Sequence, residues 1–550
     1  MLGPYIGLAM DPSRINDINI LVSIHETYGF GFSPINFLGI LLIIIFGLRT
    51  FFAILINQRI LAFCRDVQIS LRTSMMSSYQ GMSYERFISR DSSDAITNIT
   101  ILTMYYTNNV LYYCLKAIAE LLLALFIFSF LISINISLVL ILSFGLAFLV
   151  LAYNNFFKTR MNSYGKKMNE ANSNAVQSVK QSLEGVKEVR ILGKENFFLN
   201  RLKKNAREYA SLHANSLLIT TGSKYFIEFA VLIFFVMSIS ASGFFVSNES
   251  EDIFGTLGMF AFAAIRLLPG VNIISAAVLQ LRSQKNTVDR LYETVDELNL
   301  DLDAKEKFNQ KTNINDKKTK QLNSIKLKDV SYAYPSSKKN ILEKVSIEIF
   351  KGESIGVIGP SGAGKTTLID ILLGLLSPSS GKILFNGENL SHVIEDWRNI
   401  TAYIPQDSLM INETLSLNIN LSEDLDLSNQ KNLLSKSIFQ AQLSEVVKNL
   451  PEGLQTNIGE GGIRLSGGQR QRVSLARAIF HSRDVLVFDE ATSALDTETE
   501  KEVIREIKKM KGIKTMIIIT HRNESLKFCD RIYKIENGQI TGEGSPEEML

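Results

Sequence analysis

Long runs of apolar residues dominate the chain up to about residue 282. Five such runs are Phe37–Ile56, Ile118–Ile132, Ile136–Tyr153, Phe226–Val246 and Ile253–Leu281. A helix needs about 20 apolar residues to cross a bilayer, so the first, fourth and fifth runs are long enough by themselves. The second and third are joined by a short polar hinge and predict a helical hairpin. The pattern therefore predicts a polytopic α-helical membrane domain, with buried helices of a soluble protein as the weaker alternative.

The pattern changes in the second half of the chain. A polar segment, Glu293–Asn323, is dense in Lys, Asp, Asn and Gln, as a solvated linker would be. Beyond it, alternating apolar residues resume at Ile325–Val330, and the short apolar run Ser354–Ile358 precedes the apolar segment Leu368–Leu376. Strand-like and helix-like segments in this order indicate an α/β domain. We expect a transmembrane domain at 1–292, a linker at 293–325 and an α/β domain at 326–550.

The distribution of charge predicts the orientation of the spans. Lys and Arg are frequent in the long connections Asn57–Tyr113 and Asn154–Lys224, whereas Ser133–Asn135 and Ser247–Asp252 contain none. Because connections rich in Lys and Arg stay on the cytoplasmic side, we expect the two long connections in the cytoplasm. The α/β domain is expected on the same side. The membrane is expected to be the inner (cytoplasmic) membrane. The net charge of only +3 argues against nucleic acid as a partner.

Three motifs in the second half carry chemistry. The loop Gly359–Thr366 follows a predicted strand, and in such loops glycines cradle phosphates, Lys365 reaches the β- and γ-phosphates and the hydroxyl of Thr366 suits Mg²⁺. Asp489 ends an apolar strand and is expected to hold Mg²⁺, while Glu490 is the candidate that polarises an attacking water. The Gly-rich segment Leu465–Gln469 is expected to cap a helix and to offer N–H groups and a hydroxyl to an anion.

Together and in this order, the three motifs resemble the ATPase domain of ABC transporters of the exporter, half-transporter type. The resemblance implies ATP and Mg²⁺ as cofactors. It gives Gln406 the role of the Q-loop residue, His521 that of the switch histidine and Tyr334 that of the aromatic that stacks on adenine. A structural histidine, a strand-end tyrosine and a helix-capping Glu490 are the plainer alternatives for these positions.

The implied site has three overlapping sets of residues. The catalytic set is Glu490, His521 and Gln406, and the metal set is Thr366, Gln406 and Asp489. The nucleotide-binding set is Tyr334, Gly359, Pro360, Ser361, Gly362, Ala363, Gly364, Lys365, Thr366, Thr367, Leu465, Ser466, Gly467, Gly468 and Gln469.

The resemblance also bears on assembly. In ABC proteins the signature loop, which Leu465–Gln469 resembles, completes the nucleotide site of the opposite subunit. A second copy of the chain is therefore implied as partner, and a heterodimer with a similar chain remains an alternative. Six spans are typical of half-transporters and five complete runs are present. Met1–Met10 is similar to the last turns of a further span, so we expect that the chain as given begins late. Tyr84–Phe87 and Gly193–Phe197 resemble coupling helices, with ordinary amphipathic turns as the alternative.

Charges inside the predicted spans are the clues to the substrate, since each costs about 2.5–3.5 kcal/mol on insertion scales. Arg49 and Arg266 lie in apolar runs and could grip a phosphate, or else snorkel or pair with a carboxylate. Lys224 is a weaker candidate because Glu228 stands four residues later.

These residues, with Pro269 and Asn272, resemble the bacterial lipid-linked oligosaccharide flippase, from which the chain departs at Ile273. The resemblance implies a polyprenyl-(pyro)phosphate-linked oligosaccharide, or a similar membrane lipid, as substrate. A general lipid or multidrug exporter and a peptide exporter remain alternatives.

Overall fold

The computed structural model describes residues 34–133, 136–245, 250–297, 320–335, 337, 339–422, 427–491 and 496–550. The chain divides into two compact units, Met1–Met82 with Phe87–Thr312 and Ser83–Arg86 with Asn313–Leu550. The segment Met1–Met10, most of the predicted linker and parts of the two short span connections lie outside the described residues.

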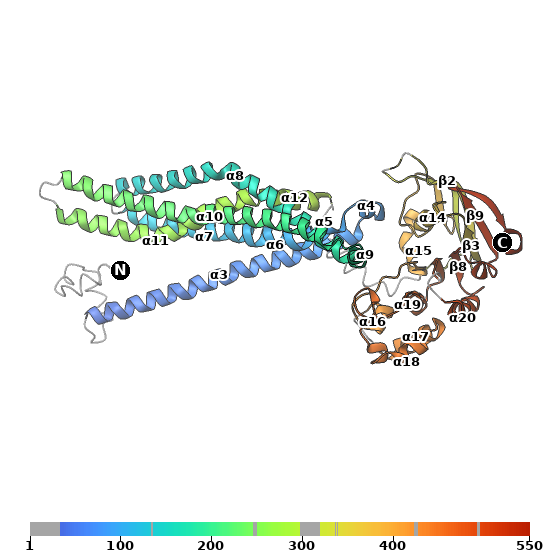
Figure 1. Ribbon diagram of the computed structural model, residues 1–550. Helices are drawn as coiled ribbons and strands as arrows, with labels where there is room; N and C mark the ends of the chain where they lie inside the picture. Colours follow the sequence, from blue (N-terminus) through green and yellow to red (C-terminus); the bar gives the residue numbers. More distant parts are fainter. Residues whose placement is uncertain are drawn as a thin grey trace. The chain divides into compact units, whose positions relative to one another are not determined.

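The described residues of the first unit form helices joined by short turns, without strands (Figure 1). Its long helices are α3 (Pro34–Gly81), α7 (Tyr112–Ile132), α8 (Ile136–Glu184), α10 (Glu195–Phe245) and α11 (Ser250–Ser283). Its shorter helices are α5 (Ser92–Thr97), α6 (Thr103–Tyr105), α9 (Val186–Ile191) and α12 (Lys285–Glu297), while α4 (Tyr84–Ile88) crosses the boundary between the units.

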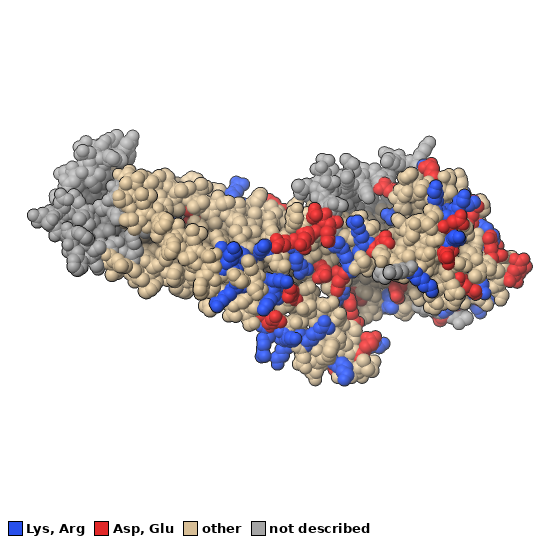
Figure 2. All heavy atoms as spheres, turned by 90° about the horizontal axis from the view of Figure 1, so that it is seen from above, with Lys and Arg blue, Asp and Glu red and all other residues tan. Residues whose placement is uncertain are grey.

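Five helical segments among the described residues are long and apolar enough to cross a membrane. They are Gly39–Gly81, Ser92–Ile132, Val139–Glu184, Glu195–Ile233 and Ala263–Ser283. Each overlaps one of the five apolar runs, so the predicted helical membrane domain is confirmed. On the face that Figure 2 shows, a broad stretch of these helices carries few charged side chains, while Lys and Arg gather beyond it.

Three of these helices are much longer than a bilayer is thick. α3, α8 and α10 have 48, 49 and 51 residues. At 1.5 Å per residue each is roughly 72–77 Å long, more than twice the hydrocarbon core of about 30 Å. The basic connections of the sequence are therefore largely continuations of these helices.

Helix α8 meets the end of α11 without intervening side chains. A Cβ on Gly165 would lie 1.7 Å from the carbonyl oxygen of Ser283, so the two backbones are in contact there. On either side of this point a hydrogen bond joins α8 to a neighbouring helix, one to α11 and one to α12. Asn154 donates to Ser275 Oγ over 3.4 Å, and Asn169 donates to Thr287 Oγ1 over 3.0 Å.

Two π-helical segments interrupt the helical stretch between Ser92 and Ile132. They are η2 (Asn98–Leu102) and η3 (Tyr106–Leu111). A π-helix shifts the backbone hydrogen bonds by one residue. Arg72 of α3 donates to the carbonyl of Thr100 over 2.8 Å and to Thr103 Oγ1 over 3.2 Å, and so supports the irregular turns.

The second unit contains two sheets. The four-stranded antiparallel sheet has the order β2-β1-β4-β5, and the six-stranded sheet has the order β10-β9-β3-β8-β7-β6. In the latter, β3 pairs in parallel with β8 and β9, and β7 pairs in parallel with β6 and β8. The predicted α/β architecture is therefore confirmed. The strands are β1 (Ser324–Tyr332), β2 (Leu342–Phe350), β3 (Ser354–Ile358), β4 (Ser380–Phe385), β5 (Glu388–Asn389), β6 (Thr401–Ile404), β7 (Val485–Asp489), β8 (Thr515–Ile519), β9 (Arg531–Glu536) and β10 (Gln539–Gly544).

Helices cover the sheets and connect their strands (Figure 1). They are α14 (Lys365–Leu372), α15 (Ile394–Ile400), α16 (Leu415–Asn420), α17 (Leu427–Gln440), α18 (Ser444–Asn449), α19 (Gly467–Phe480), α20 (Thr497–Lys508), α21 (Asn523–Leu526) and α22 (Pro546–Met549). The central strands β7 and β8 are buried along their whole length, as parallel strands covered on both faces are.

The only tryptophan of the chain anchors α14 to this core. Trp397 is fully buried, its ring packs on that of Phe385, and its indole N–H donates to the carbonyl of Leu372 over 2.8 Å. The short segment Ser83–Arg86 also belongs to this unit. There Tyr84 packs on the core, and Glu85 accepts a hydrogen bond of 3.0 Å from the hydroxyl of Tyr332.

Candidate functional site

The loop Gly359–Gly364 joins β3 to α14 and has the backbone of a phosphate cradle. Gly364 has φ of 102°, and a Cβ there would lie 2.8 Å from Leu342 and 3.0 Å from the carbonyl of Ile341, so the position requires glycine. Lys365 begins α14 and donates to the carbonyls of Gly359 and Pro360 over 2.8 and 3.0 Å. The predicted strand–loop–helix context is confirmed.

Lys365 stands in a conflicting electrostatic environment. Its side chain is buried, and burial lowers the pKa of its ammonium group. The charges of Glu490 and Asp489 act in the opposite direction and raise that pKa. These interactions place the cation near both carboxylates, where a bound phosphate would supply further negative charge.

The residues after Lys365 connect the loop to the candidate adenine-stacking tyrosine. Thr366 is exposed, as a hydroxyl that contacts a metal or phosphate must be, whereas Thr367 is buried. The hydroxyl of Tyr334 lies 3.3 Å from Thr367 Oγ1, and its ring meets that of Tyr332 edge-on with centroids 5.1 Å apart. Tyr334 is thus fixed beside the first turn of α14, where stacking on a base is geometrically suitable; that role stays a prediction.

Asp489 ends β7 and is almost completely buried. The hydroxyl of Tyr403 donates to its Oδ2 over 3.0 Å. Burial raises the pKa of Asp489, and so does the charge of Glu490, while the hydrogen bond from Tyr403 and the charge of Lys365 lower it. Tyr403 belongs to none of the three sequence motifs. It lies on β6, and only the parallel pairing of β6 with β7 brings it beside Asp489, so no local signal in the sequence marks it.

Three residues predicted to be catalytic meet at the carboxylate of Glu490. Gln406 Nε2 donates to its Oε2 over 3.0 Å, and His521 Nε2 lies 3.4 Å from its Oε1. Glu490 has φ of 48°, a left-handed conformation that costs energy for a residue with a Cβ. Its N–H donates to the carbonyl of Ile519 over 2.9 Å, which holds it there. The strained backbone thus presents the carboxylate between the amide and the imidazole.

The donors around Asp489 suit Mg²⁺. Among the described residues, no group of three or more His, Cys, Asp or Glu side chains forms a metal site. The predicted set instead combines the hydroxyl of Thr366, the amide of Gln406 and the carboxylate of Asp489. Mg²⁺ prefers oxygen ligands and is commonly bound by one or two carboxylates together with substrate phosphates. Because Gln406 gives its nitrogen to Glu490, its amide oxygen is left for a cation.

The signature loop forms the N-terminus of α19. Ser466 is the cap residue: its hydroxyl oxygen accepts from the N–H of Gln469 over 3.2 Å, and the side chain of Gln469 accepts from the N–H of Ser466 over 2.9 Å. This capping box uses a lone pair of the serine hydroxyl but leaves its proton for an external acceptor. The expected helix cap is confirmed, and its role toward an opposite subunit stays a prediction.

Four charged residues of the spans, Arg49, Lys116, Glu120 and Arg266, form a group between three helices, which we call the membrane charge cluster. Arg266 of α11 interacts electrostatically with Arg49 of α3 and with Glu120 of α7. A Cβ on Gly270 would lie 3.0 Å from the carboxylate of Glu120, so this glycine makes room for it. Arg49 and Lys116 line one hollow of about 490 Å³. With three cations and one carboxylate, the cluster has an excess of positive charge.

Lys224 does not join the membrane charge cluster in these contacts. Its ammonium group lies 3.8 Å from Glu228, and both side chains are exposed. This is the i,i+4 ion pair that the spacing allowed, and it favours the structural alternative for Lys224.

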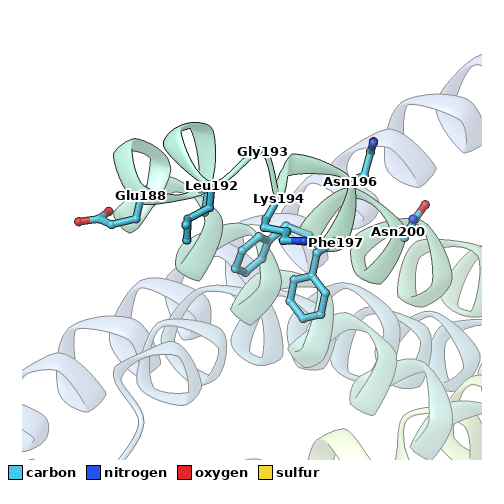
Figure 3. A pocket seen from close by; sticks show the side chains of 9 residues that line it. Glu188, Leu192, Gly193, Lys194, Asn196, Phe197 and Asn200 are labelled. Carbon is cyan, nitrogen blue, oxygen red and sulfur yellow. The ribbon is translucent and has the colours of Figure 1, made fainter.

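The tip between α9 and α10 is exposed and apolar. Ile191, Leu192 and Phe197 are 78%, 68% and 59% exposed. Figure 3 shows Leu192 and Phe197 pointing to the same side of a hollow of about 660 Å³, with Gly193 at the turn between the helices. This is the segment that resembles the second coupling helix.

Comparison with known proteins assigns the two halves separately. The sequence matches the ABC transporter transmembrane region over residues 13–265 and the ABC transporter family, which describes the ATPase, over residues 342–493.

Two curated relatives are ATP-dependent lipid A-core flippases. The ATP-dependent lipid A-core flippase of Cupriavidus pinatubonensis is 37% identical over 40% of this chain and 38% of its own length. That of Dechloromonas aromatica is 27% identical over 72% of this chain and 65% of its own. The chain thus spans about two fifths of the length of the first curated relatives it matches.

A bacterial Atm1-family ABC exporter, solved with ATP bound, has the same fold, with a TM-score of 0.77 at 23% identity over 95% of this chain and 91% of that one. This likeness extends over both halves. With a multi-pass transmembrane region followed by an ABC ATPase domain in one polypeptide, the chain belongs to the ABC transporters.

Proposed function

We propose that this chain is one half of an ATP-driven exporter that moves an anionic amphipathic lipid across a membrane. The observation that carries the substrate part is the membrane charge cluster, in which the three cations Arg49, Lys116 and Arg266 outnumber the single carboxylate of Glu120. Cations in a span are expensive unless they serve a pathway or a ligand. A lipid with a phosphorylated headgroup supplies the missing negative charge.

The arrangement of the ATPase site supports ATP hydrolysis as the source of energy. Lys365 and the loop glycines bind the β- and γ-phosphates, and Glu490 accepts the proton of the attacking water while Gln406 and His521 hold its carboxylate in position. Mg²⁺, held by Thr366, Gln406 and Asp489, would neutralise phosphate charge. Tyr334 would stack on the adenine from the side of Thr367.

A second copy of the chain is the proposed partner. The signature loop of Ser466 presents a hydroxyl proton and helix N–H groups, which would complete the nucleotide site of the other copy. The apolar tip at Leu192 and Phe197 is exposed in the single chain, and burial against an ATPase surface in the dimer would remove it from water. Because Glu490, His521 and the signature residues are all present, a homodimer is favoured over a heterodimer.

The headgroup class distinguishes the possible substrates. Relatives are lipid A-core flippases, and the membrane half resembles the flippase of polyprenyl-pyrophosphate-linked oligosaccharides. The two substrates share phosphate near a bulky glycan, which is the chemistry that an arginine pair recognises. We propose the polyprenyl-linked glycan, in an inner membrane with the ATPase on the cytoplasmic side, and make lipid A-core the second arm of the test.

The test removes the cations of the cluster one at a time in proteoliposomes. Arg266→Ala and Arg49→Ala should abolish or strongly reduce flipping of a labelled polyprenyl-pyrophosphate glycan while basal ATPase activity remains. Arg266→Lys should restore transport only in part, because an ammonium keeps the charge and loses the planar fork. Lys224→Ala is the matched control, since this lysine has a carboxylate partner at the helix surface.

The outcomes separate the alternatives. Flipping of a lipid A-core analogue but not of the polyprenyl glycan would move the assignment to the lipid A class. Equal transport of neutral amphiphiles and unaffected transport by the double variant Arg49→Ala with Arg266→Ala would refute an anionic headgroup and favour a multidrug or peptide exporter. A lower melting temperature together with a loss of ATPase activity in Arg266→Ala would mean that the arginine stabilises the fold and does not bind the substrate.

A further inference from the structure

We propose that Tyr403 is a positioning residue for Asp489: its hydroxyl fixes one carboxylate oxygen so that the other is presented to the divalent cation of the nucleotide. This inference rests on the proposed ATP site and adds a residue to it. Nothing in the three sequence motifs assigns a role to Tyr403, which stands on β6 outside the phosphate loop, the signature loop and the strand that carries Asp489.

The sheet places the phenol beside the carboxylate. β6 and β7 run in parallel, with Tyr403 opposite Val487 and Ile404 opposite Phe488. Asp489 therefore lies two residues further along the neighbouring strand, within reach of a long side chain that leans toward the strand end. The hydroxyl donates to Oδ2 of Asp489 over 3.0 Å. One oxygen of a buried carboxylate is thus occupied, and Oδ1 is left for the cation.

The hydrogen bond from Tyr403 matters because the surroundings of Asp489 are unfavourable to its negative charge. Asp489 is 8% exposed and stands next to the charged Glu490 on the chain. Burial and this like charge both raise the pKa of Asp489, and the hydrogen bond from Tyr403 lowers it. Groups that hydrogen-bond to metal ligands orient them, and loss of such a partner typically costs about 10–100-fold in metal affinity or activity.

The hydroxyl can be removed without disturbing the core. Tyr403 is 40% exposed and belongs to neither hydrophobic cluster of the unit among the described residues. Asp370 and Tyr84 are its other electrostatic neighbours. In Tyr403→Phe the ring stays, and Asp489 loses a donor whose place only water can take.

The experiment measures the linkage between nucleotide and Mg²⁺ in the full-length protein. Binding of a fluorescent ATP analogue is titrated in EDTA and in Mg²⁺, and ATPase activity is followed against Mg²⁺ concentration. In Tyr403→Phe, binding in EDTA should stay within about twofold of wild type. The tightening by Mg²⁺ should fall by about tenfold, and the Mg²⁺ concentration for half-maximal activity should rise accordingly. Tyr533→Phe is the control: it removes a hydroxyl that bonds a backbone carbonyl of the same unit over 3.4 Å.

A double-mutant cycle tests whether Tyr403 acts through Asp489. If it does, Tyr403→Phe should have no further effect on Mg²⁺ linkage in an Asp489→Asn background. An unchanged Mg²⁺ linkage in the single variant would overturn the inference, as would an equal loss of binding in EDTA or unfolding of the nucleotide-free variant, because the hydroxyl would then serve the fold. If wild type itself showed no Mg²⁺-dependent binding of the nucleotide, the proposed function would fail instead.

Discussion

The carboxyl group of Asp370 provides a test of the electrostatics around the phosphate loop. Asp370 lies on α14, five residues after Lys365, and no sequence motif assigns it a role. Burial, and next the charge of Asp489, raise its pKa from 3.8 to about 6. We predict that Asp370→Asn, which removes the charge and keeps the shape, stabilises the nucleotide-free ATPase unit at pH 7.

The magnitude follows from the pKa difference. A pKa shift of about two units corresponds to about 3 kcal/mol of folding free energy at about 1.36 kcal/mol per unit. Because Asp370 is partly exposed, solvent screening reduces the expected gain in stability to about 1–3 kcal/mol. The folded pKa lies above the unfolded one, so between about pH 4 and 6 the folded state keeps a proton that the unfolded state has lost. This contribution favours folding at low pH and is lost as pH rises to about 6.

Trp397 makes the assay specific to this unit. It is the only tryptophan in the chain, and it bonds the carbonyl of Leu372, two residues beyond Asp370. Urea unfolding of the full-length protein, followed by tryptophan fluorescence in EDTA, therefore reports on α14 and its core. The midpoint of Asp370→Asn should exceed that of wild type at pH 7, and the difference should shrink at pH 5. Glu547→Gln, an exposed carboxylate on α22, is the control.

Two results would refute this reasoning. A variant that is less stable than wild type at both pH values would mean that the carboxylate makes a favourable contact, and not an unfavourable one. A gain that is the same at pH 5 and pH 7 would mean that it does not come from ionisation.

Two further substitutions test other parts of the molecule. Glu490→Gln should keep ATP binding and lower the rate of hydrolysis at least about 100-fold, because the water loses its base while the phosphate loop stays intact; hydrolysis near the wild-type rate would remove Glu490 from that role. Gly165→Ala should destabilise the first unit by about 1–3 kcal/mol through overpacking against Ser283, whereas Gly145→Ala, with open space around it, should be neutral or stabilising. Thermal melts by circular dichroism compare the two, and equal melting temperatures would contradict the backbone contact.

Much of the fold could be predicted because the apolar runs mark the buried strands and the membrane-spanning helices. The predicted strand at Ser354–Ile358 is β3, and the apolar strand predicted to end at Asp489 is β7, since both are parallel strands that are buried, β7 completely and β3 except at Ile358. The transmembrane helices could be placed for the same reason, by the lengths of their apolar runs. The extent of these helices beyond the membrane could not, because polar helices depend on tertiary packing and not on composition.

In the ATPase half, the motif residues could be found because their types and spacing follow from phosphate and metal chemistry. Tyr403 and Asp370 could not, since a phenol 86 residues from its acceptor has no local signal. The π-helical turns near Thr100 are equally hidden, because their support comes from Arg72 on another helix. Lys224 is the opposite case, because its partner Glu228 could be predicted from the four-residue spacing alone.

The contact between Gly165 and Ser283 sets the distance between α8 and α11, because two backbones that touch without side chains cannot approach further. From this point α8 continues for about 18 Å to Tyr153 and for about 28 Å to Glu184. A methyl group at position 165 would therefore act on the spacing of two long helices, and not on a binding site.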